Sequence, residues 1–94
     1  MKVRKFFENS STLNYSAVIE ALLEMDGTFV VENVGTCTVT FYGSVTGVNW
    51  LSLGTCSTTS SAPISKLSLT DKYPKMMATV TSYTDGKVNA YVVG

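Results

Sequence analysis

Histidine is absent from this 94-residue sequence, and charged residues are scarce. Lys, Arg, Asp and Glu make up 15% of the chain, whereas they form about 25% of an average domain. Without histidine the usual acid–base catalyst near neutral pH is missing, and the chain has no nucleophile or phosphate-binding motif. Seven basic residues balance seven acidic ones, so no net charge attracts the chain to nucleic acid or acidic lipid. These absences predict a protein that is not an enzyme and has no catalytic residues.

Metal-binding and membrane-spanning patterns are also missing. The two cysteines, Cys37 and Cys56, are too few for a zinc site when no histidine is present, and we expect neither a metal nor a cofactor. No apolar stretch approaches the roughly 20 residues of a transmembrane helix. The basic start at Lys2, Arg4 and Lys5 is not followed by the apolar run of a signal peptide. The sequence therefore predicts no membrane association and shows no export signal.

Threonine and serine largely take the place of charge, and these residues suit the solvated faces of strands. The length fits one domain with one modest core, and we expect a single β-sandwich domain over residues 1–94. Residues 1–15 are predicted to form an N-terminal arm or an edge strand. Residues 16–24 contain good helix formers. That stretch is short and lacks a capping box, so we favour a strand over a helix there.

Four three-residue segments end in glycine and predict turns: Met25-Asp26-Gly27, Asn33-Val34-Gly35, Val45-Thr46-Gly47 and Thr84-Asp85-Gly86. A three-residue hairpin loop is a type I turn followed by a left-handed residue, a position that glycine fills best. Side chains alternate between the faces of a strand, so a hairpin keeps its core only if inward residues face inward residues. Each segment meets this condition as a direct hairpin. We therefore predict four hairpins with structural turns at Gly27, Gly35, Gly47 and Gly86.

These hairpins fix a register and an apolar inward face. The predicted inward pairs are Ala78–Val92, Val80–Ala90, Phe41–Leu51, Val39–Leu53, Leu23–Phe29, Ala21–Val31, Phe29–Val39 and Val31–Cys37. Glu20 is predicted to lie opposite Glu32, which is the one unfavourable pair. A further strand is predicted over residues 64–69, after a long polar connection over residues 54–63. Six or seven short strands at this spacing predict a small antiparallel β-sandwich of the jelly-roll or immunoglobulin-like kind.

The same register separates the two cysteines. Cys37 falls opposite Thr55, which places Cys56 on the other face of the sheet. Two cysteines on opposite faces do not form a disulfide easily. We predict two free thiols, with Cys37 in the core and Cys56 in a loop.

The hairpin around Gly47 places two aromatic residues opposite one another on its outward face. Tyr42 and Trp50 form this predicted pair, and Tyr83 and Tyr91 are also predicted to face outward. A cross-strand aromatic pair stabilises a hairpin by itself. On a face that is not buried in the sandwich, such a pair also suits a protein interface or stacking on a sugar ring. The residues alone leave these three interpretations open, so all four aromatics are candidate interface or glycan contacts.

The segment Gly43–Leu53 (Gly-Ser-Val-Thr-Gly-Val-Asn-Trp-Leu-Ser-Leu) resembles the Gly-Ser-x-Asp-Gly-x-x-Trp hairpin of discoidin-like and phage virion β-sandwich modules. Residues Lys72–Tyr83 resemble the penultimate strand of those modules, and Gly86–Val93 matches the place of their last strand. The resemblance covers residues 28–93 of this chain. Thr46 stands where those modules usually have an aspartate, and no ligand residue is carried over.

The resemblance implies a non-enzymatic structural component of a tailed-phage particle, either a capsid decoration protein or a tail or fibre subunit. Such a protein acts by contacts with other virion proteins, as a homo-oligomer or with capsid or tail subunits. It reaches the virion from the bacterial host cytoplasm without an export signal, because lysis releases the particles. The alternative is a carbohydrate-binding module that uses the Tyr42–Trp50 pair to attach to host-surface glycans.

Overall fold

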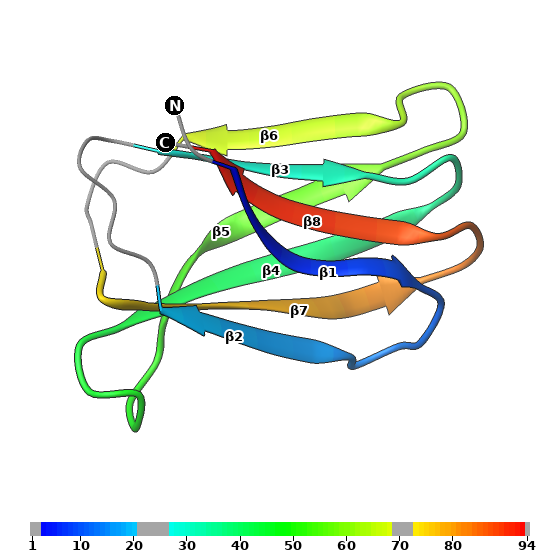
Figure 1. Ribbon diagram of the computed structural model, residues 1–94. Helices are drawn as coiled ribbons and strands as arrows, with labels where there is room; N and C mark the ends of the chain where they lie inside the picture. Colours follow the sequence, from blue (N-terminus) through cyan, green and yellow to red (C-terminus); the bar gives the residue numbers. More distant parts are fainter. Residues whose placement is uncertain (1–2, 21–26, 69–72, 94) are drawn as a thin grey trace.

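Two antiparallel four-stranded sheets pack face to face in the computed structural model, which describes residues 3–20, 27–68 and 73–93 (Figure 1). The strands are β1 (Val3–Ser10), β2 (Ser16–Glu20), β3 (Thr28–Glu32), β4 (Cys37–Ser44), β5 (Leu51–Thr58), β6 (Ile64–Ser68), β7 (Lys75–Tyr83) and β8 (Val88–Val93). Sheet A has the order β1-β8-β3-β6, and sheet B has the order β2-β7-β4-β5. The prediction of an antiparallel β-sandwich is confirmed, but the described residues form eight strands instead of six or seven.

The N-terminal part of the chain accounts for the higher strand number. Residues 3–10 form β1 at the edge of sheet A. Strand β2 lies at the edge of sheet B and is not a helix, because Ala17 and Ile19 pack against the core while Val18 and Glu20 face solvent. This alternation suits a strand with one buried face, and it outweighs the helix propensity of the stretch.

The chain folds back on itself as one long antiparallel ribbon. Strand β1 pairs with β8, β2 with β7, β3 with β6 and β4 with β5, so the β4–β5 connection is the midpoint of the ribbon. The ribbon wraps around the core, and the additional pairs β3–β8 and β4–β7 complete the two sheets. This connectivity is that of an eight-stranded jelly roll, which decides between the two predicted types of sandwich. The C-terminal strand β8 lies inside sheet A and not at an edge.

Among the connections whose residues the structure describes in full, four cross from one sheet to the other, and we call each of these four an arch. They cover residues 11–15, 33–36, 59–63 and 84–87. All four lie at the same end of the sandwich, on the right of Figure 1, which is named the arch end. The two strands joined by an arch face each other across the core instead of pairing side by side.

Three of the four predicted hairpins are therefore wrong. The segments that end in Gly35 and Gly86 connect β3 to β4 and β7 to β8, and each connection spans both sheets. Strands β2 and β3 also lie in different sheets, so no hairpin forms at Gly27; residues 21–26, which hold the rest of that turn, lie outside the described part. Eight of the predicted inward residues on these strands are nevertheless buried: Phe29, Val31, Cys37, Val39, Ala78, Val80, Ala90 and Val92. An arch brings inward residues together across the core, just as a hairpin brings them side by side.

The arches that contain Gly35 and Gly86 lie directly against each other. A Cβ atom on Gly35 would lie 2.5 Å from the carbonyl oxygen of Asp85, and a Cβ atom on Gly86 would overlap Oδ1 of Asn33. Gly86 also has a φ of 97°, in the left-handed region that favours glycine. Asn33 Nδ2 donates to the Asp85 carbonyl oxygen at 3.1 Å, and the Thr36 N–H donates to Asp85 Oδ1 at 2.7 Å. Close backbone approach and hydrogen bonds thus join the two arches into one unit.

The hairpin predicted around Gly47 is confirmed, but its loop covers residues 45–50 and its register differs. The observed pairs are Gly43–Leu51, Tyr42–Ser52, Phe41–Gly54 and Val39–Cys56, with a bulge between the second and third pairs, in place of the predicted Phe41–Leu51 and Val39–Leu53. Side chains hold this longer loop in shape. Ser44 Oγ accepts the Gly47 N–H at 2.8 Å, and the Lys75 side chain lies against Gly47.

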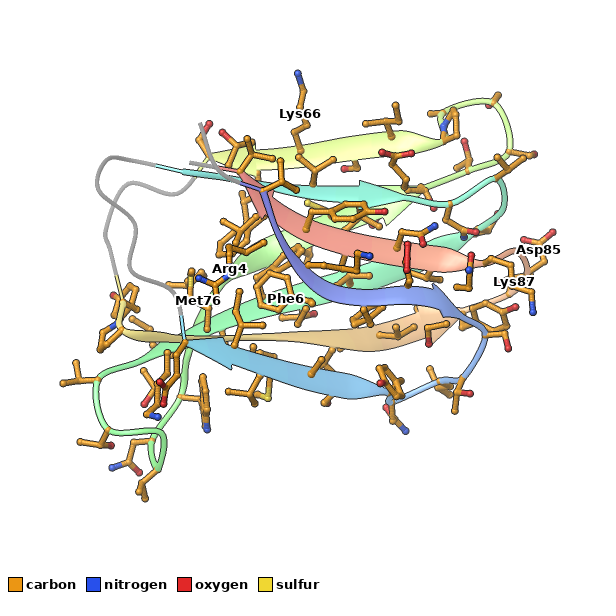
Figure 2. The ribbon with its side chains drawn as sticks, viewed as in Figure 1. Arg4, Phe6, Lys66, Met76, Asp85 and Lys87 are labelled. Carbon is orange, nitrogen blue, oxygen red and sulfur yellow. The ribbon has the colours of Figure 1, made fainter. Side chains whose placement is uncertain are left out.

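Aromatic side chains from both sheets meet in the core. Phe29 of sheet A and Phe41 of sheet B are fully buried, and their rings stack with centroids 4.2 Å apart. Phe6 of β1 is tilted beside both rings, with its centroid 6.1 Å from Phe29 and 5.6 Å from Phe41 (Figure 2). Buried aromatic side chains dominate the energetics of a core, so the N-terminal strand is an integral part of the domain.

The predicted contact between Glu20 and Glu32 is wrong. Glu20 lies opposite Lys75 of β7, and Lys75 Nζ donates to Glu20 Oε1 at 2.7 Å. Glu32 lies in sheet A, between Ile64 of β6 and Asn89 of β8. The arrangement of β2 and β3 in different sheets thus replaces a like-charge pair with an ion pair.

Candidate interaction surfaces

Three of the four candidate aromatics lie on separate parts of the surface. Tyr42 is half-buried on the outer face of sheet B, between Met77 of β7 and Ser52 of β5. Trp50 is half-buried at the end of the β4–β5 loop. Tyr91 is half-buried on the outer face of sheet A, on the other side of the sandwich. The predicted Tyr42–Trp50 pair does not form, because the longer loop brings Ser52 opposite Tyr42.

Tyr83 faces the core instead of solvent. It lies at the end of β7, packs against the core, and donates its hydroxyl to the Gly86 carbonyl oxygen at 2.6 Å. The register of β7 shifts between Val80 and Ser82, which changes the alternation and brings Tyr83 opposite Cys37. The four aromatics therefore do not form one patch, and a contact role for each of them stays a separate prediction.

Both cysteines are free thiols buried in the core. Cys56 belongs to β5 and not to a loop, where it lies opposite Val39, while Cys37 lies opposite Thr58. The prediction of two free thiols is confirmed, but both residues face inward because the observed register differs from the predicted one. Burial raises the pKa of the Cys56 thiol. A thiol that stays protonated is a poor nucleophile, so Cys56 is a small core residue.

The outer face of sheet B carries hydroxyl side chains that bond to one another. The pairs are Ser16–Thr79 at 2.9 Å, Thr40–Thr81 at 3.0 Å and Thr38–Ser57 at 3.0 Å. They link β2 to β7, β7 to β4 and β4 to β5. Because these hydroxyls satisfy one another, this face does not need a ligand to complete its hydrogen bonds.

Sheet A has a shallow hollow of about 230 Å³ on its outer face. Its lining residues are Val3, Val30, Glu32, Tyr91 and Val93. Tyr91 lies opposite Val30 on β3 and opposite Lys5 on β1. A lysine therefore lies beside the apolar side chains of this hollow. The hollow is smaller than the ligand pockets of about 300–1,000 Å³ that enclose small molecules. It suits contact with a side chain better than enclosure of a ligand.

A larger hollow of about 480 Å³ lies at the arch end. It is lined by Glu32, Asn33, Val34, Pro63, Ile64, Gly86, Lys87 and Asn89. The Asn89 amide donates to the carbonyl oxygens of Lys87 at 3.2 Å and Glu32 at 3.4 Å. Asn33 Oδ1 is buried against Gly86 and has no hydrogen-bond partner among the described residues. The amide nitrogens of Asn33 and Asn89 therefore bond to backbone carbonyl oxygens, and the exposed residues Glu32 and Lys87 also line the hollow. Figure 2 shows Lys87 at the arch end.

The β4–β5 loop extends beyond both sheets at the other end of the sandwich, named the loop end (Figure 1). Val45 and Val48 of the loop are 72% and 77% exposed, and Leu51 at the start of β5 is 58% exposed. Thr46 Oγ1 accepts the Val48 N–H at 3.2 Å, so the loop has its own internal hydrogen bonds. The motifs in the sequence did not predict this surface. The feature of the sequence that could have indicated this surface is the run over residues 33–65, which contains no charged residue.

The charged side chain that lies against this loop is paired with an opposite charge. Lys75, whose stem lies against Gly47, forms the 2.7 Å ion pair with Glu20. The hydrogen bond from Lys75 and, after it, the positive charge of Lys75 lower the pKa of the Glu20 carboxyl. The loop end thus combines exposed apolar side chains with a paired charge.

The part of the chain that the structure describes contains no group of three or more Cys, Asp or Glu side chains placed to hold a metal ion. In the same residues, no helix is long and apolar enough to cross a membrane.

No protein-family model matches the sequence, and no curated protein matches it. Among solved structures, the crystal structure of the PBSX exported protein XepA is similar, with a TM-score of 0.65 over 98% of this chain. The two sequences are 7% identical, and the match covers 36% of the XepA chain. This chain thus spans about a third of the length of XepA, and the likeness is one of fold.

Proposed function

We propose that this chain is a structural subunit of a phage particle, which acts by contacts with other virion proteins and catalyses no reaction. The β4–β5 loop carries the proposal, because internal hydrogen bonds hold it in shape while Val45, Val48 and Leu51 remain in solvent. Exposed apolar side chains grouped on one surface mark sites of protein interaction. A loop that is already ordered loses little conformational entropy on binding, which favours this use.

Two observations support the phage setting. The strand order is that of a jelly roll, a fold used by viral capsid proteins and by lectins. The similar solved structure belongs to an exported protein of the phage PBSX. Fold and likeness together favour a role in a particle over a role as an isolated binding domain.

The amount of this chain in purified phage particles tests the proposal. We expect the chain to co-purify with particles and to bind particles that lack it. A copy number that follows the capsid subunits would favour a capsid decoration protein, and a small copy number would favour a tail or fibre subunit. A chain that is absent from particles and fails to bind them would overturn the proposal.

Two matched substitutions test the role of the loop. Val48→Ser removes an apolar side chain that is 77% exposed at the loop end, whereas Val34→Ser removes one that is 76% exposed at the arch end. We expect Val48→Ser to weaken binding to particles and Val34→Ser to leave it unchanged. Both variants should keep the stability of the parent, because surface substitutions change it by about 0.5 kcal/mol or less. Equal binding by both variants would show that the loop is not the contact.

The carbohydrate-binding alternative depended on Tyr42 and Trp50 lying opposite one another, and the observed register separates them. The fold remains compatible with it, because lectins also use the jelly roll, but no arrangement of the described residues favours it. A glycan array with the parent chain and Trp50→Ala distinguishes the two functions. Sugar binding that Trp50→Ala abolishes would replace the proposal of a structural subunit with that of a binding module.

A further inference from the structure

The two sheets have four edge strands, and these edges differ in charge. In sheet A, β1 carries Arg4 and Lys5, and β6 carries Lys66, which extends away from the sandwich (Figure 2). In sheet B, β2 carries Glu20, whereas β5 has neither a charged residue nor a proline. Charged side chains and proline on an edge strand oppose pairing with a further strand. Of the four described edges, β5 alone lacks this protection.

The outer backbone of β5 has no partner in the described part of the chain. Its one strand neighbour is β4, and no described residue outside β4 forms a backbone hydrogen bond with residues 51–58. The edge of β2 is partly occupied, since Arg4 Nη2 donates to the Glu20 carbonyl oxygen at 2.8 Å. An edge with unpaired N–H and C=O groups is a template for a further strand.

The regular part of this edge is the segment 55–58. Gly54, with a φ of 143°, and the bulge beside it interrupt the strand before this segment. From Thr55 onward β5 pairs with β4 without a further shift. Thr55 and Ser57 are exposed and alternate with two buried residues, as expected for a strand with one face on the core. The segment therefore presents the backbone spacing that a new strand requires.

We propose that β5 pairs antiparallel with β5 of a second copy, which joins the two B sheets into one eight-stranded sheet across a two-fold axis. The contact is self-complementary, so the same backbone groups are satisfied in both copies. The formal net charge is zero, and no repulsion between copies opposes the contact. The exposed side chain of Leu51, on the same strand, adds apolar area. This inference goes beyond the proposed function, because the dimer forms with or without a phage particle.

Sedimentation equilibrium on the purified full chain tests the dimer. Thr55→Lys and Ser57→Lys are combined in one variant, because residues opposite each other across an antiparallel two-fold share a face. The proposed axis passes through residue 55, 56 or 57, and in each of these registers at least one introduced charge faces a like charge of the other copy. Like charges in directly opposite positions destabilise a strand pair, and we expect dimerisation to weaken by about tenfold or more.

The matched control is Ser16→Lys/Val18→Lys on β2, the other edge of sheet B, where both parent residues are exposed. We expect this variant to dimerise like the parent. Amide hydrogen exchange gives a second measurement, with protection of residues 55–58 in the dimer that is lost on dilution. A parent chain that stays monomeric at micromolar concentration would overturn the proposal. A dimer that survives the β5 variant, or that the β2 variant disrupts equally, would place the contact elsewhere and overturn it as well.

Discussion

At the arch end, four connections cross between the sheets, and two of them lie backbone against backbone; at the loop end, the β4–β5 loop extends into solvent (Figure 1). The arches are joined by close contacts at Gly35 and Gly86 and by hydrogen bonds to Asp85. The loop is held by the side chains of Ser44 and Lys75. At the arch end, backbone atoms and the buried Asn33 side chain leave no room for added atoms, whereas the long side chain of Lys75 can move aside.

The residues that stabilise the fold and the residues proposed to contact partners therefore lie at opposite ends of the sandwich. The arch end links the two sheets, so a change there disturbs both halves of the sandwich. The loop end extends a single hairpin of sheet B and exposes Val45, Val48 and Leu51. We infer that substitutions at the arch end reduce the free energy of unfolding most, and that substitutions at the loop end act mainly on binding.

Gly86→Ala is expected to have the largest effect. The new Cβ atom would overlap Asn33 Oδ1, and alanine would adopt a φ of 97°. Left-handed backbone costs a non-glycine residue roughly 1–2 kcal/mol, and overpacking adds about 1–3 kcal/mol. We expect urea denaturation to show a loss of about 3 kcal/mol. Thr84→Ala in the same arch is the control, because its exposed side chain should contribute little. A loss below that of Thr84→Ala would mean that the arches are not interlocked.

Gly47→Ala tests the same backbone conformation at the loop end. Its φ is 86°, close to that of Gly86, but the new Cβ atom would meet Lys75 Cδ at 2.9 Å. The lysine side chain can move aside, so the cost of overpacking should be small. The cost of the left-handed backbone conformation, roughly 1–2 kcal/mol, should remain. We expect urea denaturation to give a loss smaller than that of Gly86→Ala. Equal losses would contradict the difference between the two ends.

The sequence pattern predicted most of the residues that face the core, but not which strands are neighbours. Alternation correctly placed Phe29 and Val80 inward, whereas Leu51, also predicted to face inward, is 58% exposed because its register differs. The same alternation fits a hairpin and an arch equally well, because inward residues meet in both. The choice depends on pairings between distant strands, such as β1 with β8, and no local pattern contains that information. Burial was therefore predictable where topology was not.

The outward residues were harder to predict for a different reason. The longer β4–β5 loop shifted the partner of Tyr42 from Trp50 to Ser52, and a register shift in β7 turned Tyr83 towards the core. An extra residue in a strand reverses the alternation that follows it, and the sequence contains no clear mark of that shift or of the loop length. The uncharged run that includes β5 was visible in the sequence, but its meaning depends on β5 being an edge strand.

Asp85→Ala is expected to reduce the free energy of unfolding by less than Gly86→Ala does. It removes the carboxylate oxygen that accepts the Thr36 N–H at 2.7 Å, while the backbone contacts at Gly35 remain. A hydrogen bond of this kind contributes about 1 kcal/mol, and we expect that loss in urea denaturation. Asp85→Asn retains an acceptor oxygen and should lose less. If the two variants are equally destabilised, the hydrogen bond is not what joins the arches.

Glu20→Gln is expected to have the smallest effect on the free energy of unfolding, and this effect should depend on pH. Lys75 lowers the pKa of Glu20 below its ordinary value of 4.5 in the folded state. The carboxylate therefore adds stability that is fully present above the pKa of the unfolded chain and is lost as the pH falls through the lower folded-state pKa.

Thermal unfolding of the parent and of Glu20→Gln between neutral and acidic pH measures this contribution. The parent should be the more stable at neutral pH, and the difference should shrink as the pH falls below 4.5, where Glu20 of the unfolded chain and then, at lower pH, Glu20 of the folded chain binds a proton. Added salt should reduce the neutral-pH difference, because the pair is exposed and exposed charges are screened. A difference that does not change with pH would mean that Lys75 stabilises the loop end through its stem against Gly47 and not through its charge.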